Sequence, residues 1–487
     1  MEPTSTSAYL AIDLGASSGR AVLGTLEDGR MQMREVHRFP SVLVEEGGHL
    51  CWDLEGLWQE VRQGAAEALR LAPRLRSVSV DSWAVDYVPL GADGAPLRRP
   101  YAYRDPRTCG KLPEVFRRVP AEEIYARTGI QFLEFNTLPQ LVVDLQEEPD
   151  LAQRTALRLL IADYFLFRLS GRVVAERTMA STTQLMDVRS GEWADPLLCA
   201  AGDDPARWPA IVPAGTVLGE LREPPAGARP PLVVATCSHD TAAAVAAVPA
   251  TGNVPWAYIS SGTWSLVGAE LTTPVLSPAA RAAGFTNEAG LDGTIRFLKN
   301  RTGMWVLEEC MREWGEKGER PAYEGLLDAA AAAPPAAGTL DLDAPELARR
   351  GAMVARLEDA CRAAGLSVPG TRGTLVRLVL ESLADSYRRT LAELEALTGV
   401  RAEVVHVVGG GARNHLLNQL TADACGRRVV AGPQEATALG NLLVQARALG
   451  DLAAGTTVRD VARRSATLFE YLPGQPASSR ATALTPA

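Results

Sequence analysis

The sequence predicts an α/β protein with at least two hydrophobic cores, and three observations carry this prediction. The chain has 487 residues, whereas a single domain typically has about 100–200. Apolar runs typical of strands alternate with stretches of helical spacing in both halves of the chain, which is the order found in α/β folds. Apolar residues make up 47% of the chain and charged residues 22%, an ordinary composition for a globular protein.

The first half begins with two predicted strands around a turn of small residues. The turn is Asp13-Leu-Gly-Ala-Ser-Ser-Gly-Arg20, and an apolar run flanks it on each side, as in a β-hairpin. Later segments are assigned by apolar periodicity, with a period near 3.6 for helices and short buried runs for strands. The predicted elements of this half are strands 9–12, 21–26, 77–80 and 231–236, and helices 53–71 and 241–248.

The second half repeats the opening pattern near residue 257. Residues 260–265, Ser-Ser-Gly-Thr-Trp-Ser, form a second small-residue turn between apolar runs 256–259 and 266–271. Two such hairpins half a chain apart suggest two similarly built domains. The other predicted elements are helices 301–314, 375–397, 414–425 and 435–449, strands 404–408 and 428–431, a surface loop at 329–338, and disorder after residue 473.

Composition and charge exclude several classes of partner. Acidic residues outnumber basic ones, 58 against 49, and a general nucleic-acid binder usually has a basic surplus. The seven cysteines are scattered and odd in number, and none forms a CxxC pair, so no disulfide framework is expected. The first ten residues lack a basic start, and no window approaches about 18 uninterrupted apolar residues. We therefore expect a cytoplasmic protein with neither a nucleic-acid nor a membrane partner.

Several catalytic classes lack their sequence motifs. No GxxxxGK[ST] segment is present and there are no HRD or DFG patterns, which argues against a P-loop NTPase and a protein kinase. The five histidines never form HExxH, and Cys237 with His239 is too sparse for a zinc site. No GxGxxG opens a βαβ unit, so a nicotinamide dehydrogenase lacks its fingerprint.

Three turns rich in glycine remain, and each directly follows a predicted strand. They lie at residues 15–19, 260–263 and 409–411. Small residues let backbone N–H groups approach an anion closely, and successive N–H groups in a turn can cradle phosphate oxygens. Any one of them alone is more simply a tight turn. Together, at strand ends in both halves, they favour a nucleotide-binding protein.

Two aspartates stand at predicted strand ends. Asp13 is either a turn-forming residue or a carboxylate that holds Mg²⁺ through water. Asp240, in Cys237-Ser-His-Asp-Thr241, is either an ordinary helix N-cap or a general base that takes a proton from an alcohol attacking a γ-phosphate. A Cys237–His239 nucleophile is a weaker alternative, because a cysteine that ends a buried strand is usually a core residue.

Four segments together resemble the FGGY carbohydrate kinases: 13–20, 238–241, 260–265 and 409–414 (Gly-Gly-Gly-Ala-Arg-Asn). The resemblance covers about residues 8–470 and implies the actin-like ATPase fold, in which two RNase-H-like domains have the active-site cleft between them. It implies an N-terminal domain, 1–247, that binds the sugar, carries the first phosphate turn and ends with the catalytic aspartate. A C-terminal domain, 248–472, would bind ATP, and 473–487 would form a disordered tail.

Further segments resemble the rhamnulokinase branch of that family. They are Asp81-Ser-Trp-Ala-Val-Asp86, Ala102–Arg107, Gly129–Asn136, Phe285–Glu288 and Leu298–Asn300. The reaction that this resemblance implies converts ATP and L-rhamnulose to ADP and L-rhamnulose 1-phosphate, with Mg²⁺ as cofactor, in L-rhamnose catabolism. Because L-rhamnulose ends in a methyl group, Trp83, Ala84 and Phe132 are candidates for an apolar wall of the sugar pocket.

The resemblance implies a role for each residue at a matching position. Asp240 would be the catalytic base, and Asp13 remains the candidate metal ligand. The residues expected at ATP are Ala16, Ser17, Ser18, Gly19, Arg20, Thr263, Glu308 and Gly410, and those expected at the sugar are Ala84, His239, Asp240, Thr241 and Asn300. The family usually has glycine where Ala84 stands and often has glutamine where Glu308 stands.

Three alternatives stay open at this point. The chain could be an FGGY kinase for fuculose, xylulose or glycerol, although segments 81–86 and 129–136 favour rhamnulose. It could be an actin-like chaperone or filament protein without sugar chemistry, which would not need Asp240. It could be an inactive sugar-sensing regulator, against which Asp240 and the three turns argue. Both a monomer and a homodimer are compatible with the sequence.

Overall fold

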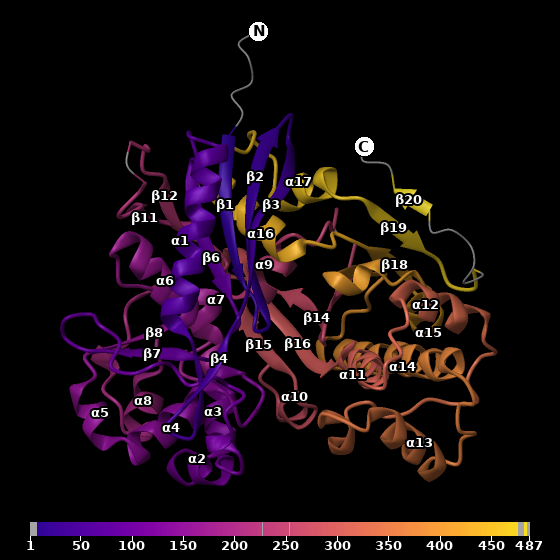
Figure 1. Cartoon of the computed structure of the whole chain (residues 1–487). Coiled ribbons are helices and arrows are strands. Elements are labelled where there is room, and N and C mark those ends of the chain that lie inside the picture. The colour runs from indigo at the N-terminus through magenta and orange to yellow at the C-terminus, as the bar shows by residue number, and fades with distance from the viewer. Residues whose placement is uncertain (1–6, 226, 253, 476–481, 485–487) are drawn as a thin grey trace. The chain divides into compact units, whose positions relative to one another are not determined.

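The computed structural model describes residues 7–225, 227–252, 254–475 and 482–484, and these form two compact units (Figure 1). The first unit is the chain up to Ala247 together with Glu270–Phe297 and Ala436–Ser465, and the second is the remainder. By their contacts, residues pass from one unit to the other within two strands, β14 (Trp264–Leu271) and β16 (Ile295–Thr302), and on both sides of segment 436–465.

The sheet of the first unit has the strand order β11-β12-β6-β1-β2-β3. Strands β1 (Ser7–Leu14), β2 (Ser18–Glu27) and β3 (Arg30–Pro40) form an antiparallel meander, which confirms the predicted first hairpin. Strand β6 (Ser77–Ser82) is parallel to β1 on one side and to β12 (Leu232–Ala235) on the other. The carboxyl ends of β1, β6 and β12 therefore meet at the same edge of the sheet.

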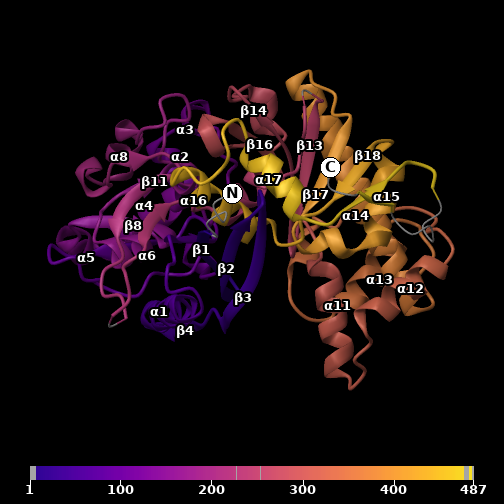
Figure 2. The ribbon, with the colours of Figure 1, turned by 90° about the horizontal axis from the view of Figure 1, so that it is seen from above.

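Helices cover both faces of this sheet. In Figure 2 the strands β1 and β2 lie between α1 (Leu54–Leu71) and α16 (Ala436–Ala448). Helix α1 begins after Asp53, whose carboxylate accepts a hydrogen bond from the Gly56 N–H at 3.3 Å, and it buries an apolar stripe at helical spacing. Helix α6 (Ile161–Ser170) packs on β6 and β12, and α9 (Asp240–Ala246) packs on α16.

A second core in the first unit lies among short helices that the sequence analysis did not predict, because segments of 6 to 11 residues show too little periodicity. The remaining elements of the unit are β4 (Leu43–Glu46), β5 (His49–Trp52), β7 (Tyr87–Leu90), α2 (Leu112–Arg118), α3 (Ala121–Thr128), α4 (Thr137–Glu147), α5 (Pro149–Arg154), β8 (Leu157–Leu160), β9 (Ala175–Glu176), α7 (Arg177–Ala180), α8 (Asp195–Ala201), β10 (Ile211–Val212), β11 (Thr216–Glu220), α10 (Pro278–Ala282), β15 (Thr286–Ala289) and α17 (Val458–Ser465).

The second unit is built on strands in the order β14-β13-β17-β18-β19-β20. The hairpin of β13 (Trp256–Ser261) and β14 confirms the predicted second hairpin, and β17 (Val404–Val408) is parallel to β13 and to β18 (Arg428–Ala431). Its core joins this sheet to several helices. The other elements are α11 (Trp305–Glu316), α12 (Tyr323–Ala332), α13 (Met353–Ala363), α14 (Arg372–Thr398), α15 (His415–Cys425), β19 (Leu468–Tyr471) and β20 (Thr482–Leu484).

Three local predictions need correction. The helix predicted at 301–314 begins only at Trp305, because Arg301 and Thr302 still belong to β16. The loop predicted at 329–338 starts as helix α12, because alanine is the strongest helix former and the helix runs on until just before Pro334 and Pro335.

The tail predicted to be disordered from residue 473 also differs in part. Residues 482–484 form β20, which pairs antiparallel with β19, whereas 476–481 and 485–487 lie outside the described residues. Within the described ranges, no helix combines the length and apolar character that crossing a membrane requires.

Candidate active site

Two aspartates lie at neighbouring strand ends of the first unit, and a third follows a neighbouring strand as the first residue of α9. Asp13 near the end of β1 is paired in register with Asp81 near the end of β6. The Ser82 N–H donates to the Ser238 carbonyl at 2.9 Å, which sets the chain leading to Asp240 beside the end of β6. Burial, followed by the nearby charges of Asp13 and Asp240, raises the pKa of Asp81 well above its usual value. The sheet therefore gathers three carboxyl groups that the sequence separates widely.

Asp13 is held by the residue opposite it in the hairpin. Arg20 is its register partner in β2, and its Nε and Nη2 each lie 2.9 Å from Asp13 Oδ2. The turn between the strands exposes Ser17 and Ser18 and leaves Ala16 half-buried. The hairpin thus presents small residues next to one carboxylate and one guanidinium.

Gly19 has a packing requirement in the same hairpin. A Cβ at this position would lie 2.2 Å from the ring of Phe39, which is buried at 3% exposure. Glycine is therefore needed for the close approach of β2 and β3, whatever else the turn binds.

Asp240 is the first residue of α9, and His239 occupies the N-cap position, so Asp240 is not the ordinary N-cap that was one alternative. Its Oδ1 accepts hydrogen bonds from the Thr241 N–H at 2.5 Å and the Thr241 hydroxyl at 3.1 Å. These contacts fall on one oxygen of a side chain that is 32% exposed. Burial, followed by the charge of Asp13, raises the Asp240 pKa to about 7, against the lowering effect of Thr241.

The imidazole of His239 lies in a buried polar environment next to Asp240. Its Nδ1 is 3.0 Å from Nη2 of Arg296, and the same Nη2 is 2.9 Å from Oε2 of Glu288. Burial and the Arg296 charge lower the His239 pKa well below its usual value, so the ring is neutral. Sequence reasoning missed Arg296; Glu288 stood within the quoted segment 285–288 without an assigned role.

A buried carboxylate supports the chain just before Asp240. Oε2 of Glu176 accepts hydrogen bonds from the Ser238 N–H at 3.0 Å and from the backbone and hydroxyl of Thr178, and the Thr178 hydroxyl in turn accepts from the His239 N–H at 3.1 Å. Burial raises the pKa of Glu176 to about 7. No local pattern could have revealed this contact, because Glu176 and Ser238 are 62 residues apart.

The segment around Ala84 is anchored by Asp86. The Asp86 carboxylate accepts from the indole N–H groups of Trp52 and Trp83 at 2.7 and 3.0 Å, and burial raises its pKa to about 6. Ala84 itself is half-buried. Trp83 packs in the core beside the sheet, whereas Phe132 packs against the separate helical core. The two aromatic residues of the expected apolar wall therefore belong to different hydrophobic clusters.

The other two residues expected at the sugar, Thr241 and Asn300, belong to different units. Thr241 is half-buried beside Asp240 in the first unit. Asn300 lies in the part of β16 that belongs to the second unit.

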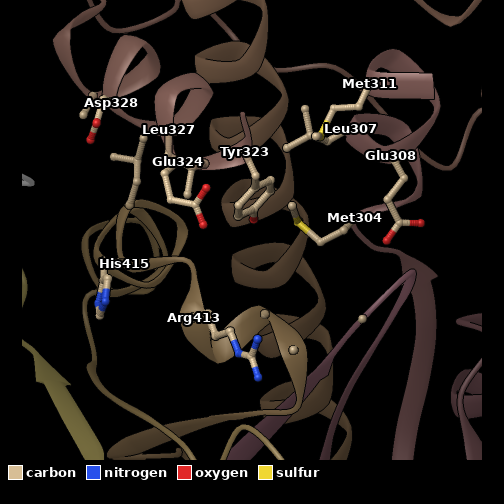
Figure 3. Close-up of a pocket in the computed structure, with 15 residues that line it drawn as sticks. Met304, Leu307, Glu308, Met311, Tyr323, Glu324, Leu327, Asp328, Arg413 and His415 are labelled. Carbon is tan, nitrogen blue, oxygen red and sulfur yellow. The ribbon is translucent and has the colours of Figure 1, made fainter. Parts of the chain in front are cut away.

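The second unit contains a pocket of about 660 Å³ (Figure 3). Its walls come from the β13–β14 turn, α11, α12, and the segment that follows β17. Glu308 and Gly410 line it together, and the Thr263 hydroxyl lies 3.2 Å from a Glu308 carboxylate oxygen, so three residues expected at ATP are neighbours. The lining residues are Gly262, Met304, Leu307, Glu308, Met311, Tyr323, Glu324, Leu327, Asp328, Ala331, Gly410, Gly411, Arg413, His415 and Leu416.

Two small-residue turns meet at the bottom of this pocket. A Cβ on Gly411 would lie 2.0 Å from Oγ of Ser261. The turn after β17 can therefore approach the hairpin this closely only with glycine at position 411. The Met304 N–H donates to the Gly262 carbonyl at 2.9 Å, which fixes the start of α11 to the same hairpin. A Cβ on Gly262 would meet nothing closer than 3.7 Å, so a side chain at this position in the pocket lining has room.

The residues near Asp13 fit a hydrated Mg²⁺ ion. Across the described part of the chain, no group of three or more acidic, cysteine or histidine side chains is arranged to hold a metal directly. Oδ1 of Asp81, however, is buried and has no hydrogen-bond partner among the described residues, next to the carboxylate of Asp13. Mg²⁺ usually keeps several waters and takes one or two carboxylates together with substrate phosphates, so this donor set suits it.

Solved structures with the same architecture are sugar kinases of the actin-like ATPase fold. Gluconate kinase from Lactobacillus acidophilus superposes with a TM-score of 0.79 at 18% identity, covering 96% of this chain and 94% of that one. Glycerol kinase from Plasmodium falciparum with ADP gives a TM-score of 0.76 at 16% identity, with the same coverage. At these identities the likeness establishes the fold alone, and it confirms the predicted fold class.

The chain belongs to the FGGY family of carbohydrate kinases: residues 8–247 match the family's N-terminal domain and residues 257–449 its C-terminal domain. It is therefore a sugar kinase, with ATP and a sugar as its substrates. It is 41% identical over 471 residues to the rhamnulokinase of Bacteroides thetaiotaomicron, covering 96% of each chain. It is 42% identical over 466 residues to that of Klebsiella pneumoniae, covering 95% of this chain and 94% of the other.

Proposed function

We propose that this protein transfers the γ-phosphoryl group of ATP to the C1 hydroxyl of L-rhamnulose, giving ADP and L-rhamnulose 1-phosphate. The observation that carries the proposal is the identity of 41–42% with rhamnulokinases over almost the whole chain. Kinases named for gluconate, xylulose and glycerol share the fold at only 16–21% identity. That contrast favours rhamnulose over the other sugars and polyols.

Asp240 is the general base of the proposed reaction. Its Thr241 contacts lie on Oδ1, and its half-buried side chain leaves Oδ2 for the sugar. As the C1 oxygen bonds to the γ-phosphorus, its proton passes to Oδ2, and the bond from the γ-phosphorus to the bridging oxygen of ADP breaks. A carboxylate with a pKa of about 7 is a suitable acceptor at neutral pH, because its basicity matches the medium.

The nucleotide is assigned to the turns and the pocket of the second unit. The adenosine part would occupy the pocket between α11, α12 and Gly410, near Glu308. The phosphates would contact Thr263, and the β1–β2 turn from Ala16 to Arg20 would add backbone N–H groups and one guanidinium. Mg²⁺ would be held through water by Asp13, with Asp81 beside it, and would neutralise phosphate charge when bound.

The test is an ADP-release assay over L-rhamnulose, L-fuculose, D-xylulose and glycerol, with ³¹P NMR of the product. We expect the highest kcat/KM with L-rhamnulose and a phosphomonoester on C1. A higher kcat/KM with another acceptor would overturn the substrate assignment, and ATP hydrolysis without any phosphorylated acceptor would overturn the kinase. The proposal includes a cytoplasmic location, where ATP is available, and either a monomer or a homodimer.

A further inference from the structure

A buried chain of three polar side chains ends at the imidazole of His239. Glu288 and His239 are each 7% exposed, and Arg296 between them is completely buried. Nη2 of Arg296 lies 2.9 Å from Glu288 Oε2 and 3.0 Å from His239 Nδ1, and its Nε donates to the Ala289 carbonyl at 3.0 Å. The guanidinium is therefore held from both sides, by a carboxylate and by a backbone carbonyl.

This arrangement fixes the position of the proton on the neutral imidazole. A guanidinium has only donors, so the atom that faces Arg296 Nη2 must be an acceptor. His239 Nδ1 therefore carries the lone pair, and the ring proton lies on Nε2. The opposite tautomer would bring two N–H groups together at 3.0 Å. Its proton would face Oε2 of Glu288 instead, which lies farther from Nδ1, at 3.5 Å, so the closer Arg296 contact decides the tautomer.

Nε2 is the ring nitrogen of His239 that lies next to Asp240. His239 Nε2 lies 3.3 Å from Asp240 Oδ1, the same oxygen that accepts from the N–H and the hydroxyl of Thr241. Two hydrogen bonds from Thr241 and the nearby imidazole nitrogen thus lie at Oδ1, and Oδ2 is the oxygen left for the substrate.

We propose that Arg296, held by Glu288, is a positioning residue that fixes His239 as the Nε2-protonated tautomer and thereby makes Asp240 Oδ2 the oxygen that accepts the sugar proton. The role of Asp240 Oδ2 as proton acceptor rests on the proposed function, in which Asp240 is the base. The tautomer of His239 is independent of that function, because it follows from the buried contacts alone.

The first test is ¹⁵N NMR of the full-length protein labelled at histidine, without substrates. The chain has five histidines, and the His239→Gln variant identifies the signals of His239 by their loss. We expect a neutral ring with a protonated Nε2 and an unprotonated Nδ1. A protonated Nδ1, or a charged ring at pH 7, would overturn the proposal even if the enzyme phosphorylates L-rhamnulose.

The second test compares two buried arginines of the same unit. Arg296→Met removes the contact to His239, whereas Arg158→Met removes an equally buried guanidinium, paired with Asp203 at 2.7 Å in the separate helical core. We expect Arg296→Met to lower kcat on the order of 10–100-fold with the KM for ATP unchanged, as for residues that orient a reacting group. Arg158→Met should lower the melting temperature with little change in kcat.

The outcomes separate the two proposals. Equal losses of kcat in both variants would mean that Arg296 has only a structural role, and would overturn the positioning role. If Arg296→Met does not fold, Glu288→Gln, which weakens the hold on Arg296, should shift the population of His239 tautomers, and an unchanged tautomer would overturn the role of Glu288. Failure of every acceptor in the ADP-release assay, with the expected tautomer observed, would instead overturn the proposed function.

Discussion

Asp240 has a half-exposed carboxylate with a raised pKa. Its proposed role as the base can therefore be tested by a single substitution. Asp240→Asn keeps the size and most hydrogen bonds of the side chain but cannot take a proton. We expect turnover to fall by about 10²–10⁴-fold, the usual loss for a general base, with ATP affinity nearly unchanged. Steady-state kinetics and calorimetric titration with ATP measure the two quantities. Turnover above about a tenth of the wild-type value would show that Asp240 is not the base.

The same carboxyl predicts a pH dependence. The base must be ionised, so kcat/KM for the sugar should fall about tenfold per pH unit below a midpoint near the Asp240 pKa of about 7 and level off above it. The Thr241 hydroxyl lowers this pKa, so Thr241→Val should move the midpoint to higher pH, and Thr241→Ser, which keeps the hydroxyl, should not. A midpoint that stays in place in Thr241→Val would contradict the assignment.

The prediction for substrate choice concerns Ala84, a residue expected at the sugar. The methyl end of L-rhamnulose needs an apolar neighbour, and an apolar pocket rejects an added hydroxyl by on the order of 10²-fold. Trp83 is only 5% exposed and donates its indole N–H to Asp86, so it has no free donor for an added hydroxyl. We expect a preference for L-rhamnulose over the 6-hydroxy ketohexose of the same stereochemistry, and a smaller preference in Ala84→Gly. Equal kcat/KM for the two sugars in the wild type would contradict the hypothesis of an apolar wall.

At the scale of elements, the β13–β14 hairpin joins the turn after β17 and the start of α11. Gly262 lines the pocket and has room for a Cβ, so Gly262→Val should fold normally but obstruct a phosphate that approaches the backbone. We expect a higher KM for ATP with the KM for the sugar unchanged. Gly262→Ala, whose Cβ meets nothing closer than 3.7 Å, is the matched control with a smaller effect. An unchanged KM for ATP in a folded Gly262→Val protein would exclude this turn from the phosphate site.

At the scale of the whole molecule, buried carboxyl groups make stability depend on pH. The pKa of Glu176 is raised from 4.5 to about 7, so the folded protein keeps this proton over a range in which the unfolded chain loses it. Stability should therefore fall as pH rises between these values, by on the order of 3 kcal/mol for Glu176. Asp81 and Asp163, whose pKa values burial also raises, act in the same direction.

Glu176→Gln isolates this contribution. The amide oxygen can still accept from Ser238 and Thr178, and the amide has no proton to lose. We expect the urea midpoint of the wild type to drop between pH 5 and pH 8, and a smaller drop in Glu176→Gln. The same drop in both proteins would mean that Glu176 does not hold a proton in the folded state.

Local physics explains what the sequence alone determined. The first and second hairpins, helix α1 and the strands β6, β12, β17 and β18 follow from apolar periodicity and small-residue turns, which act over a few residues. Motifs of the same short range identified Asp240 and the family. Errors at this level were also local, as where alanine-rich residues 329–332 proved helical.

Only the tertiary structure decided which groups meet. Arg296 reaches His239 across 57 residues, and Asn441 donates to Asp81 across 360, because the chain returns to the first unit twice, at Glu270–Phe297 and at Ala436–Ser465. Periodicity constrains a residue's neighbours within one element, and it carries no information on which elements pack together. Asp240, the proposed base, could thus be picked out from the sequence, whereas the buried groups around it depend on the packing of distant segments.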